Sequence, residues 1–347
     1  MKNNRLIYVL IVILAIWCII LTTTLNNTTS SEKEIISEYN ITGISTDFTK
    51  IVDNTYSSIV TISNNGNYST GFIYKQVDNN IYVLTSYHGV GETTNCGVNF
   101  ASGYSSVGEL VGYDVFLDLA VLRIESPYTV ETLNLVDCSQ LNSGEFVISI
   151  GTPISLEFAQ SVEMGMISNN IRTIENSISV QDENHNYYLD VIQLSSNLKP
   201  GYSGSPVINM NGEVIGMTTM SLDEHFNFAV TSNEVKIVAD KIINGNEVNK
   251  HQLGIKGTYI KDMPLFEKSN LNLSVDTIYG LYVNRIMENS ICSTGDIKVG
   301  DVILNINGTD INNINDYLSV AYSETDSFEF EILRANENIK IKVDLND

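Results

Sequence analysis

Short runs rich in β-branched and aromatic residues, separated by Gly, Asn, Asp and Ser, constrain the fold of this chain more than any other feature. Between residues 57 and 230 they read SSIVTIS, TGFIYKQ, NIYVLTS, GELVGY, LAVLRIE, EFVISIG, MGMISN, LDVIQLS, SPVINM, EVIGMTTM and FNFAV. Many short strands with regular turn signals are typical of an antiparallel barrel or sandwich. A parallel sheet would need helices between its strands, and none is indicated. The sequence predicts an all-β domain over residues 48–246.

One helix is expected to close this domain. Thr231 occupies an N-cap position, and Glu234 follows at the spacing of a capping box. Asn244 and Gly245 provide the stop signal. Apolar residues recur at helical spacing between these signals, at Val235, Val238, Ala239 and Ile242. A polar link over 246–251 follows.

A second domain is expected over residues 250–347. It mixes the strand-like runs LGIKG, GLYVNRI, DVILNING, FEFEILR and IKIKVDL with short helices, which indicates an α+β fold. Residues 315–322 have a helical apolar pattern.

The N-terminal run 6–25 is almost entirely apolar and has the length of a helix that crosses a bilayer. Lys2 and Arg5 precede the run and no basic cluster follows, so the N-terminus is expected in the cytoplasm and the rest outside. The rival interpretation is a cleaved signal peptide, but no A-x-A site follows. We assign 1–25 to a cytoplasmic stub and transmembrane anchor, and 26–47 to a polar stalk.

The formal net charge of -22 argues against nucleic-acid binding, because an acidic surface repels phosphate backbones. Solubility explains the acidity equally well. Four cysteines, Cys18, Cys96, Cys138 and Cys292, match no zinc spacing. Cys96 and Cys138 either pair in an oxidising compartment or are buried free thiols. His225 lies near two acidic residues, but no third ligand is spaced for a metal.

Three short segments place a histidine, an aspartate and a serine next to predicted strands. His88 follows a strand-like run in LTSYHGV, Asp118 precedes one in DVFLDLAVLRI, and Ser203 lies in the glycine-rich KPGYSGSPVIN. Each has a structural explanation when taken alone, because such His and Asp residues usually support turns. Together, on an all-β background, they indicate nucleophilic catalysis.

The chemistry explains why these residue types are needed. A serine hydroxyl is a poor nucleophile near neutral pH and needs an imidazole to accept its proton. A carboxylate must hold the imidazole in the right tautomer, and backbone N–H groups must face the developing oxyanion. The amides of Gly201 and Ser203 are candidates for that oxyanion hole. Glycine permits the unusual backbone that turns the Gly201 N–H inward.

These segments resemble the trypsin-like serine proteases of the HtrA/Deg type, which carry a C-terminal PDZ domain. LTSYHGV resembles the family's T-N-x-H-V-V, VGYDVFLDLAVLRI resembles V-G-x-D-x-x-x-D-L-A-V-L-x-I, and IQLSSNLKPGYSGSPVINM resembles I-Q-T-D-A-x-I-N-P-G-N-S-G-G-P-L. The resemblance makes His88 the general base, Asp118 rather than Asp114 the triad carboxylate, and Ser203 the nucleophile. It implies a chymotrypsin/trypsin-like fold of two six-stranded β-barrels with the site between them.

Three positions depart from the family pattern. Ser205 stands where the family usually has Gly, Tyr202 where it has Asn, and Gly89 where it has Val. No departure removes a triad group, so catalysis is still expected.

The stretch before the serine lines, in this family, the pocket for the residue that precedes the cut. Here it contains Asn197 and Leu198 and no Asp or Glu, whereas an acidic floor would select Arg or Lys. We assign the substrate pocket to these two residues and expect cleavage after small or medium aliphatic residues. The nearby stretch 181–187 is polar and is expected to be an exposed loop.

The second domain resembles a PDZ domain. Leu253, Gly254 and Ile255 in LGIKG resemble the carboxylate-binding loop usually written G-L-G-F, with Gln252 in place of the usual leading residue. Such a loop binds a terminal carboxylate while an edge strand pairs with the ligand. The alternative is a PDZ domain that serves only for packing or as a gate.

The sequence thus predicts a membrane-anchored, ATP-independent serine endopeptidase acting on misfolded or damaged extracytoplasmic proteins of a bacterium. No Walker-type phosphate loop occurs, and no cofactor is expected. The expected partners are unfolded proteins at the active site, peptide C-termini at the PDZ domain and the cell membrane; the resemblance alone suggests a homotrimer. The alternatives are a PDZ-bearing chaperone or scaffold with weak or no proteolysis, and a structural anchor protein.

Overall fold

The computed structural model describes residues 41–180, 183–222, 226–271, 273–274 and 277–345, together with 14, 16–18, 21 and 22. The chain divides into two units, residues 1–50 and 51–347. Apart from those few positions, the predicted anchor 6–25 lies outside the described residues. Among the described helices, none has the length and apolar character needed to span a bilayer.

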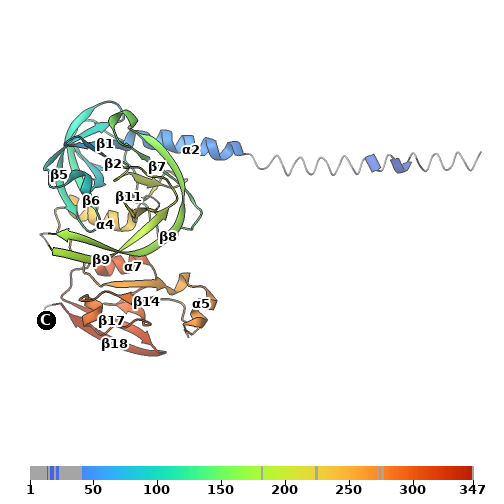
Figure 1. Ribbon diagram of the computed structural model, residues 1–347, viewed down its shortest axis with the longest axis vertical. Helices are drawn as coiled ribbons and strands as arrows, with labels where there is room; N and C mark the ends of the chain where they lie inside the picture. Colours follow the sequence, from blue (N-terminus) through green and yellow to red (C-terminus); the bar gives the residue numbers. More distant parts are fainter. Residues whose placement is uncertain are drawn as a thin grey trace, which may run out of the picture. The chain divides into compact units, whose positions relative to one another are not determined.

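Six antiparallel strands close the first β-barrel, in the order β1-β2-β3-β6-β5-β4 (Figure 1). They are β1 (Ile59–Asn64), β2 (Asn67–Val77), β3 (Asn80–Ser86), β4 (Asn95–Phe100), β5 (Ser105–Asp114) and β6 (Leu119–Glu125). Their apolar residues fill the interior, where Val60, Ile62, Ile73 and Leu122 have no exposed surface. Strand β4 was not predicted, because its sequence NCGVNF contains residues that usually mark turns.

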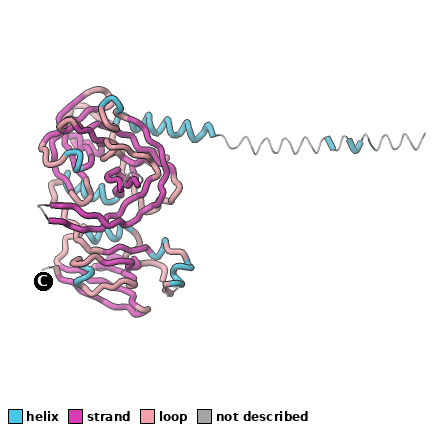
Figure 2. The backbone as a smooth tube through the Cα atoms, in the orientation of Figure 1, coloured by secondary structure: helices cyan, strands magenta, loops and turns pink. Residues whose placement is uncertain are grey.

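A second closed barrel follows in the order β10-β11-β12-β9-β8-β7. Its strands are β7 (Phe146–Gly151), β8 (Ser161–Val180), β9 (Glu183–Leu194), β10 (Pro206–Ile208), β11 (Val214–Leu222) and β12 (Phe226–Thr231). Val147, Ile192, Val207 and Ala229 lie in its core. The double β-barrel expected from the sequence is therefore confirmed, and Figure 2 shows how strands dominate both barrels.

Strands β8 and β9 form a hairpin that extends well beyond the barrel (Figure 2). Ile178 pairs with His185, and Val180 pairs with Glu183. The expectation of a loop over 181–187 is therefore wrong from residue 183 onward. Residues 183–186 are polar and occupy exposed strand positions. The alternation of apolar and polar residues that would reveal a strand in the sequence is therefore absent there.

Helix α4 (Ser232–Ile243) begins where the sequence predicted. The Thr231 side chain accepts a hydrogen bond from the Glu234 N–H, and Gly245 adopts a positive φ of 73° after the last turn. The helix contacts β5 and β6 of the first barrel and β11 and β12 of the second. It therefore fastens the two barrels together, burying the apolar face formed by Val235, Val238, Ala239 and Ile242.

Helix α2 (Ile41–Thr55) was not predicted. Its first turns fall within the stretch assigned to a polar stalk, 26–47. Ile41, Ile44, Phe48 and Ile51 recur at helical spacing, but the intervening Thr, Ser, Asp and Gly residues obscure the pattern.

The C-terminal domain contains a sheet in the order β13-β14-β15-β17-β18, with β16 paired to β15. The strands are β13 (Ile255–Tyr259), β14 (Leu281–Ile286), β15 (Val302–Ile306), β16 (Thr309–Asp310), β17 (Ser327–Arg334) and β18 (Glu337–Asp344). The helices are α5 (Leu265–Asn270), α6 (Ile291–Thr294) and α7 (Ile314–Ala321). Asn313 and Asp316 form a capping box at the start of α7, which confirms the helix predicted near 315–322.

Candidate active site

Antiparallel pairing of β3 with β6 brings His88 and Asp118 together. Ser86, the last residue of β3, lies opposite Leu119, the first residue of β6. His88 follows β3 in the short helix α3 (Tyr87–Val90), and Asp118 immediately precedes β6. The two residues are 30 positions apart in sequence but lie at the same end of adjacent strands.

Asp118 holds the histidine at several points. Its Oδ2 lies 2.7 Å from His88 Nδ1, its Oδ1 accepts the His88 backbone N–H at 2.9 Å, and its carbonyl accepts the Tyr87 N–H at 3.0 Å. The Thr219 hydroxyl also donates to Asp118 Oδ2, at 2.6 Å. Asp118 has a φ of 55°, which is strained for a residue with a side chain. These contacts fix the orientation of the imidazole.

The charge state of His88 depends on this carboxylate. The hydrogen bond to Asp118 raises the pKa of His88 above its ordinary value of 6.5, while partial burial opposes the rise. A neutral His88 that donates from Nδ1 to Asp118 carries its lone pair on Nε2. Nε2 is then the atom available to accept a proton.

The turn that carries Ser203 is anchored to the first barrel. The Thr70 N–H donates to the Ser203 carbonyl at 3.0 Å, and the Thr70 hydroxyl donates to the Gly201 carbonyl at 2.7 Å. The Gly204 N–H donates to the Thr218 carbonyl at 2.8 Å. The serine turn of the second barrel is thus tied to β2 of the first barrel, which faces it across the site.

Gly201 has the backbone conformation expected of an oxyanion-hole residue in this turn. Its φ is 104°, and a Cβ placed there would lie 2.1 Å from the Thr152 carbonyl oxygen. Only glycine fits such a position. The amides of Gly201 and Ser203 flank Tyr202, whose ring lies buried beneath the turn with its hydroxyl donating to the Ser161 carbonyl at 3.1 Å.

His88 and Ser203 line the same cavity of about 270 Å³. The Ser203 hydroxyl donates to the Thr219 carbonyl at 3.5 Å, which is at the long limit for a hydrogen bond. Such a weak contact leaves the hydroxyl able to rotate toward the imidazole, as catalytic hydrogen bonds often tighten only when substrate is bound. The structure therefore brings His88 and Ser203 to one cavity, and Asp118 is hydrogen-bonded to His88.

The substrate-pocket residues have different positions. Leu198 lines the cavity, with Asn227 and Phe228 nearby, and the Asn227 amide donates to the Ser196 carbonyl at 2.8 Å. Asn197 does not line it: its side chain is exposed, and its backbone N–H donates to the Glu163 carboxylate at 3.2 Å. Of the two residues assigned to the pocket, Leu198 thus lines this cavity and Asn197 does not, whereas Asn227 does. Among the cavity-lining residues that the structure describes, none is Asp or Glu.

Two departures from the family pattern have structural counterparts. Ser205 is fully buried, and its hydroxyl has no hydrogen-bond partner among the described residues. Gly89 has no room for the valine side chain that the family usually has there. A Cβ atom at Gly89 would already lie 2.5 Å from the Ser69 Oγ and 3.1 Å from the Ser86 Oγ. Neither departure alters the groups that surround His88 and Asp118.

The predicted carboxylate-binding loop leads into β13. Gly254 has a φ of 71°, and the Met287 N–H donates to its carbonyl at 2.9 Å. Leu253 and Ile255 are buried, but the Leu253 N–H already donates to the His251 carbonyl at 2.9 Å. Of the three loop residues, Ile255 lines the large cavity beside β13.

The described part of the chain contains no cluster of three His, Cys, Asp or Glu side chains suited to a metal, and His225 lies outside it. Cys96 and Cys138 are buried free thiols, so they do not form the disulfide that the sequence left open. Burial raises the pKa of both thiols, which disfavours the reactive thiolate.

Thr70 and Thr219 were missed at the level of sequence. Each is one of many threonines in strand-like runs, and nothing in its spacing distinguishes it. Their roles depend on contacts between barrels and between distant strands, which only the folded chain reveals.

Comparison with known families agrees with this arrangement. The trypsin-like peptidase domain family matches residues 69–217, and the PDZ domain family matches residues 242–321. Among solved structures, the HtrA-type protease AlgW with tripeptide aligns with a TM-score of 0.60 at 22% identity, covering 86% of this chain and 96% of that one. The serine endoprotease from Yersinia pestis aligns with a TM-score of 0.52 at 22% identity, with the same coverage. These likenesses establish the fold.

Curated relatives share more of the sequence. The chain is 31% identical over 274 residues to the serine protease Do-like HtrB of Bacillus subtilis (strain 168), which covers 76% of this chain and 59% of the relative. It is 29% identical over 286 residues to the serine protease Do-like HtrA of Lactobacillus helveticus, covering 80% and 68%. The chain thus spans 59% of the length of HtrB. It belongs to the HtrA/Deg family, in which a trypsin-like peptidase domain is joined to a PDZ domain.

Proposed function

We propose that this chain is a serine endopeptidase with His88, Asp118 and Ser203 as its catalytic triad. The observation that carries the proposal is the His88–Asp118 pair at 2.7 Å in a site whose cavity also contains Ser203. The names of the curated relatives, which are serine proteases, support the same activity. Hydrolysis of casein by the purified chain tests it, and its absence under all conditions would favour the binding-protein alternative.

The first half of the reaction forms an acyl-enzyme. The Ser203 Oγ attacks the carbonyl carbon of the scissile peptide bond while His88 Nε2 takes the hydroxyl proton. The amides of Gly201 and Ser203 stabilise the negative charge that develops on the carbonyl oxygen. The intermediate collapses as the C–N bond breaks, and His88 gives its proton to the departing amine. Asp118 stabilises the imidazolium throughout.

The second half restores the enzyme. A water molecule gives a proton to His88 Nε2 and attacks the acyl carbon. The ester bond to Ser203 then breaks, the carboxylic acid product leaves, and the serine recovers its proton from His88. No metal or nucleotide takes part in either half of this proposal.

The pH dependence of cleavage is expected to follow His88. The general base must be neutral, and the hydrogen bond to Asp118 raises the pKa of His88 above 6.5. Cleavage should therefore decline as the pH falls through that raised pKa, and it should be strongly reduced near pH 5. The measurement is kcat/KM for a fluorogenic peptide between pH 5 and 9. A flat profile down to pH 5 would exclude His88 as the base.

Cleavage is expected after small or medium aliphatic residues. Leu198 and Phe228 line the cavity beside Ser203 without an acidic partner for a basic side chain. Peptides that differ only in the residue before the cut should show kcat/KM at least about tenfold higher for Val or Ala than for Lys, since an unpaired buried ammonium is costly. A preference for Lys or Arg would contradict this pocket assignment.

The biological setting is part of the proposal. The apolar run 6–25 supports a single membrane anchor with the peptidase and PDZ domains outside the cytoplasm, where misfolded or damaged proteins would be the substrates. An anchored chain should stay in the membrane pellet after alkaline carbonate extraction and dissolve only in detergent. Release by carbonate would contradict the anchor.

A homotrimer is also proposed, chiefly on the family resemblance. Exposed apolar side chains on β8 and the adjoining 3₁₀ segment offer a surface of the kind that subunit contacts cover; they are Leu156, Phe158, Val162, Met164 and Met166. Sedimentation in detergent would distinguish a trimer from a monomer.

The PDZ domain is proposed to bind peptide C-termini. Strand β13 lies at the edge of its sheet beside helix α7, and extended ligands add to such edges. A chaperone or scaffold with weak proteolysis is the second candidate, supported by this same binding surface. Casein cleavage that disappears with the Ser203→Ala substitution would decide for the peptidase.

A further inference from the structure

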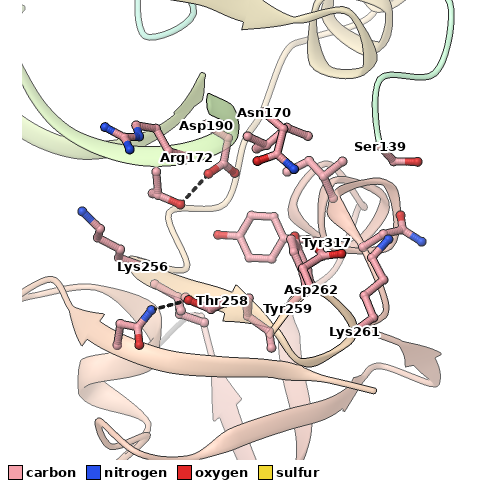
Figure 3. A pocket seen from close by; sticks show the side chains of 18 of the residues that line it. Ser139, Asn170, Arg172, Asp190, Lys256, Thr258, Tyr259, Lys261, Asp262 and Tyr317 are labelled. Carbon is pink, nitrogen blue, oxygen red and sulfur yellow. Dashed lines mark hydrogen bonds between the residues drawn. The ribbon is translucent and has the colours of Figure 1, made fainter. Parts of the chain in front are cut away.

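A cavity of about 560 Å³ lies between the PDZ domain and the peptidase domain (Figure 3). One wall consists of β13 and the start of α7, including Ile314 and Tyr317. The other wall belongs to the β8–β9 hairpin and includes residues 169–174 and Asp190. The groove in which a PDZ ligand would lie is therefore lined by both domains.

Strand β13 can accept a ligand strand along this cavity. It pairs with β14 on one side and is the terminal strand of the sheet among the described residues. The residues Lys256, Gly257, Thr258 and Tyr259 all line the cavity. An extended peptide that paired with this edge would have side chains facing the hairpin, because alternate side chains of a strand project to opposite sides.

Asp190 is the acidic residue of the hairpin wall. It pairs with Thr173 in the β8–β9 ladder, and the Thr173 hydroxyl donates to its Oδ1 at 2.6 Å. Figure 3 shows the Asp190 side chain directed into the cavity above the Tyr317 ring. Within the described part of the chain, no Lys, Arg or His lies within 4 Å of this carboxylate to form an ion pair.

The basic residues around the cavity leave this carboxylate unpaired. Figure 3 shows the charged ends of Arg172 and Lys256 directed away from Asp190, and Lys261 lies on the opposite side of Tyr317. Burial raises the pKa of Asp190, and the hydrogen bond from Thr173 and the charge of Lys250 only partly offset that rise. The Lys250 ammonium is itself bonded to Glu234, so a cation bound in the cavity would be the direct ionic partner of Asp190.

Two polar clusters hold the walls of the cavity at a fixed spacing. In the first, Asp137 accepts hydrogen bonds from Asn233 at the start of α4, at 2.8 Å, and from Asn315 in α7, at 3.1 Å. Burial raises the pKa of Asp137, but the hydrogen bonds from Asn233, Ser139 and Asn315 outweigh it and lower that pKa to about 2. The carboxylate thus remains charged and bound to both domains at neutral pH.

The second cluster joins α4 to the end of α7. Glu234 has 1% of its side chain exposed, and its Oε1 accepts hydrogen bonds from Lys250 at 2.5 Å and from Tyr322 at 2.9 Å. Breaking a buried pair of this kind leaves an uncompensated charge, which is strongly unfavourable. Helix α7 is therefore fixed to the peptidase domain. The β8–β9 hairpin consequently stays beside the PDZ groove as one of its walls.

We propose that Asp190 is a specificity-determining residue of the PDZ groove and accepts the side chain of a Lys or Arg near the carboxyl end of the bound peptide. The inference rests on the proposed function of the PDZ domain as a binder of peptide C-termini. The ligand's backbone pairs with β13, and its basic side chain crosses the cavity to Asp190. The peptidase domain thereby selects which C-termini the PDZ domain binds.

The test measures peptide binding without cleavage. The full chain in detergent micelles, carrying Ser203→Ala, is titrated into labelled decapeptides that share an apolar C-terminal residue and carry Lys, norleucine or Glu at one of the four preceding positions. At one position, Lys should bind about tenfold more tightly than norleucine, as expected for a hydrogen bond between charged groups. Asp190→Asn should remove that advantage and leave norleucine binding unchanged.

Asp262→Asn is the matched control, because Asp262 lines the same cavity from the PDZ domain but is exposed. It should retain the preference for Lys. The proposal is overturned if no position favours Lys, if the preference survives Asp190→Asn, or if no peptide binds at all. Casein hydrolysis by the unsubstituted chain is measured separately. Failure of the Asp190 proposal can therefore be distinguished from failure of the peptidase assignment.

Discussion

Replacement of Ser203 by alanine is expected to reduce kcat for casein and peptide hydrolysis by about 10⁵–10⁶-fold. The substitution removes the only atom that forms the acyl-enzyme, and the remaining catalysis comes from the oxyanion hole and binding. Folding should be preserved, because among the described residues the Ser203 hydroxyl makes only the 3.5 Å contact with the Thr219 carbonyl. Peptide hydrolysis is compared with thermal unfolding of the same preparation.

Ser205→Ala is the matched control for that substitution. Ser205 lies two residues away in the same turn, but its buried hydroxyl has no partner among the described residues. Removing an unsatisfied hydroxyl should leave the melting temperature equal or higher. Activity within a few-fold of the unsubstituted chain is expected. A loss comparable to that of Ser203→Ala would mean that both substitutions disrupt the turn rather than the nucleophile.

Asp118→Asn is expected to lower kcat by about 10⁴-fold while the site keeps its shape. The asparagine amide can donate to His88 Nδ1, which stabilises the tautomer that carries its proton on Nε2 and cannot accept the serine proton. The hydrogen bond that raises the pKa of His88 is lost as well. The remaining activity should still decline at low pH, but the midpoint of that decline should lie at a lower pH than in the unsubstituted chain. The measurement is the pH profile of kcat/KM for both proteins.

Asp114→Asn separates this effect from a general loss of acidic charge. Asp114 lies four residues upstream, and its Oδ1 accepts the Leu117 N–H at 2.8 Å. An asparagine Oδ1 can accept the same hydrogen bond, so the loop before Asp118 should keep its conformation. Activity should change by less than about tenfold. Equal losses in Asp114→Asn and Asp118→Asn would remove the reason for assigning the carboxylate to Asp118.

The two barrels could be predicted because their strands are buried on one face and bounded by clear turn residues. The runs at 80–86 and 119–125 coincide with β3 and β6, each of which has four consecutive buried residues. Strand β4 escaped prediction because its sequence contains Asn and Gly, which usually mark turns. The outer part of the β8–β9 hairpin escaped it because its exposed polar residues carry no periodic apolar signal. Helix α2 escaped it because Thr and Asn residues interrupt its apolar spacing.

The proposed triad could be chosen from the sequence because three chemical roles require three residue types in a known order. Sequence placed His88 and Asp118 at strand ends, and the β3–β6 pairing explains why those ends meet. It did not identify Asn227 as part of the substrate cavity, nor Thr219 as a partner of Asp118, since each contact joins segments far apart in the chain. The contribution of both domains to the lining of the PDZ groove likewise depends on how the domains pack, and no local sequence pattern predicts it.

Peptide hydrolysis by this chain requires Ser203 to be an activated nucleophile beside His88. Labelling the folded chain with a fluorophosphonate, followed by peptide mapping of the modified residue, tests this in one experiment. We expect a single adduct on Ser203, formed more slowly as the pH falls and abolished in His88→Ala. An adduct on another residue, or no adduct in a chain that hydrolyses casein, would contradict the proposed triad.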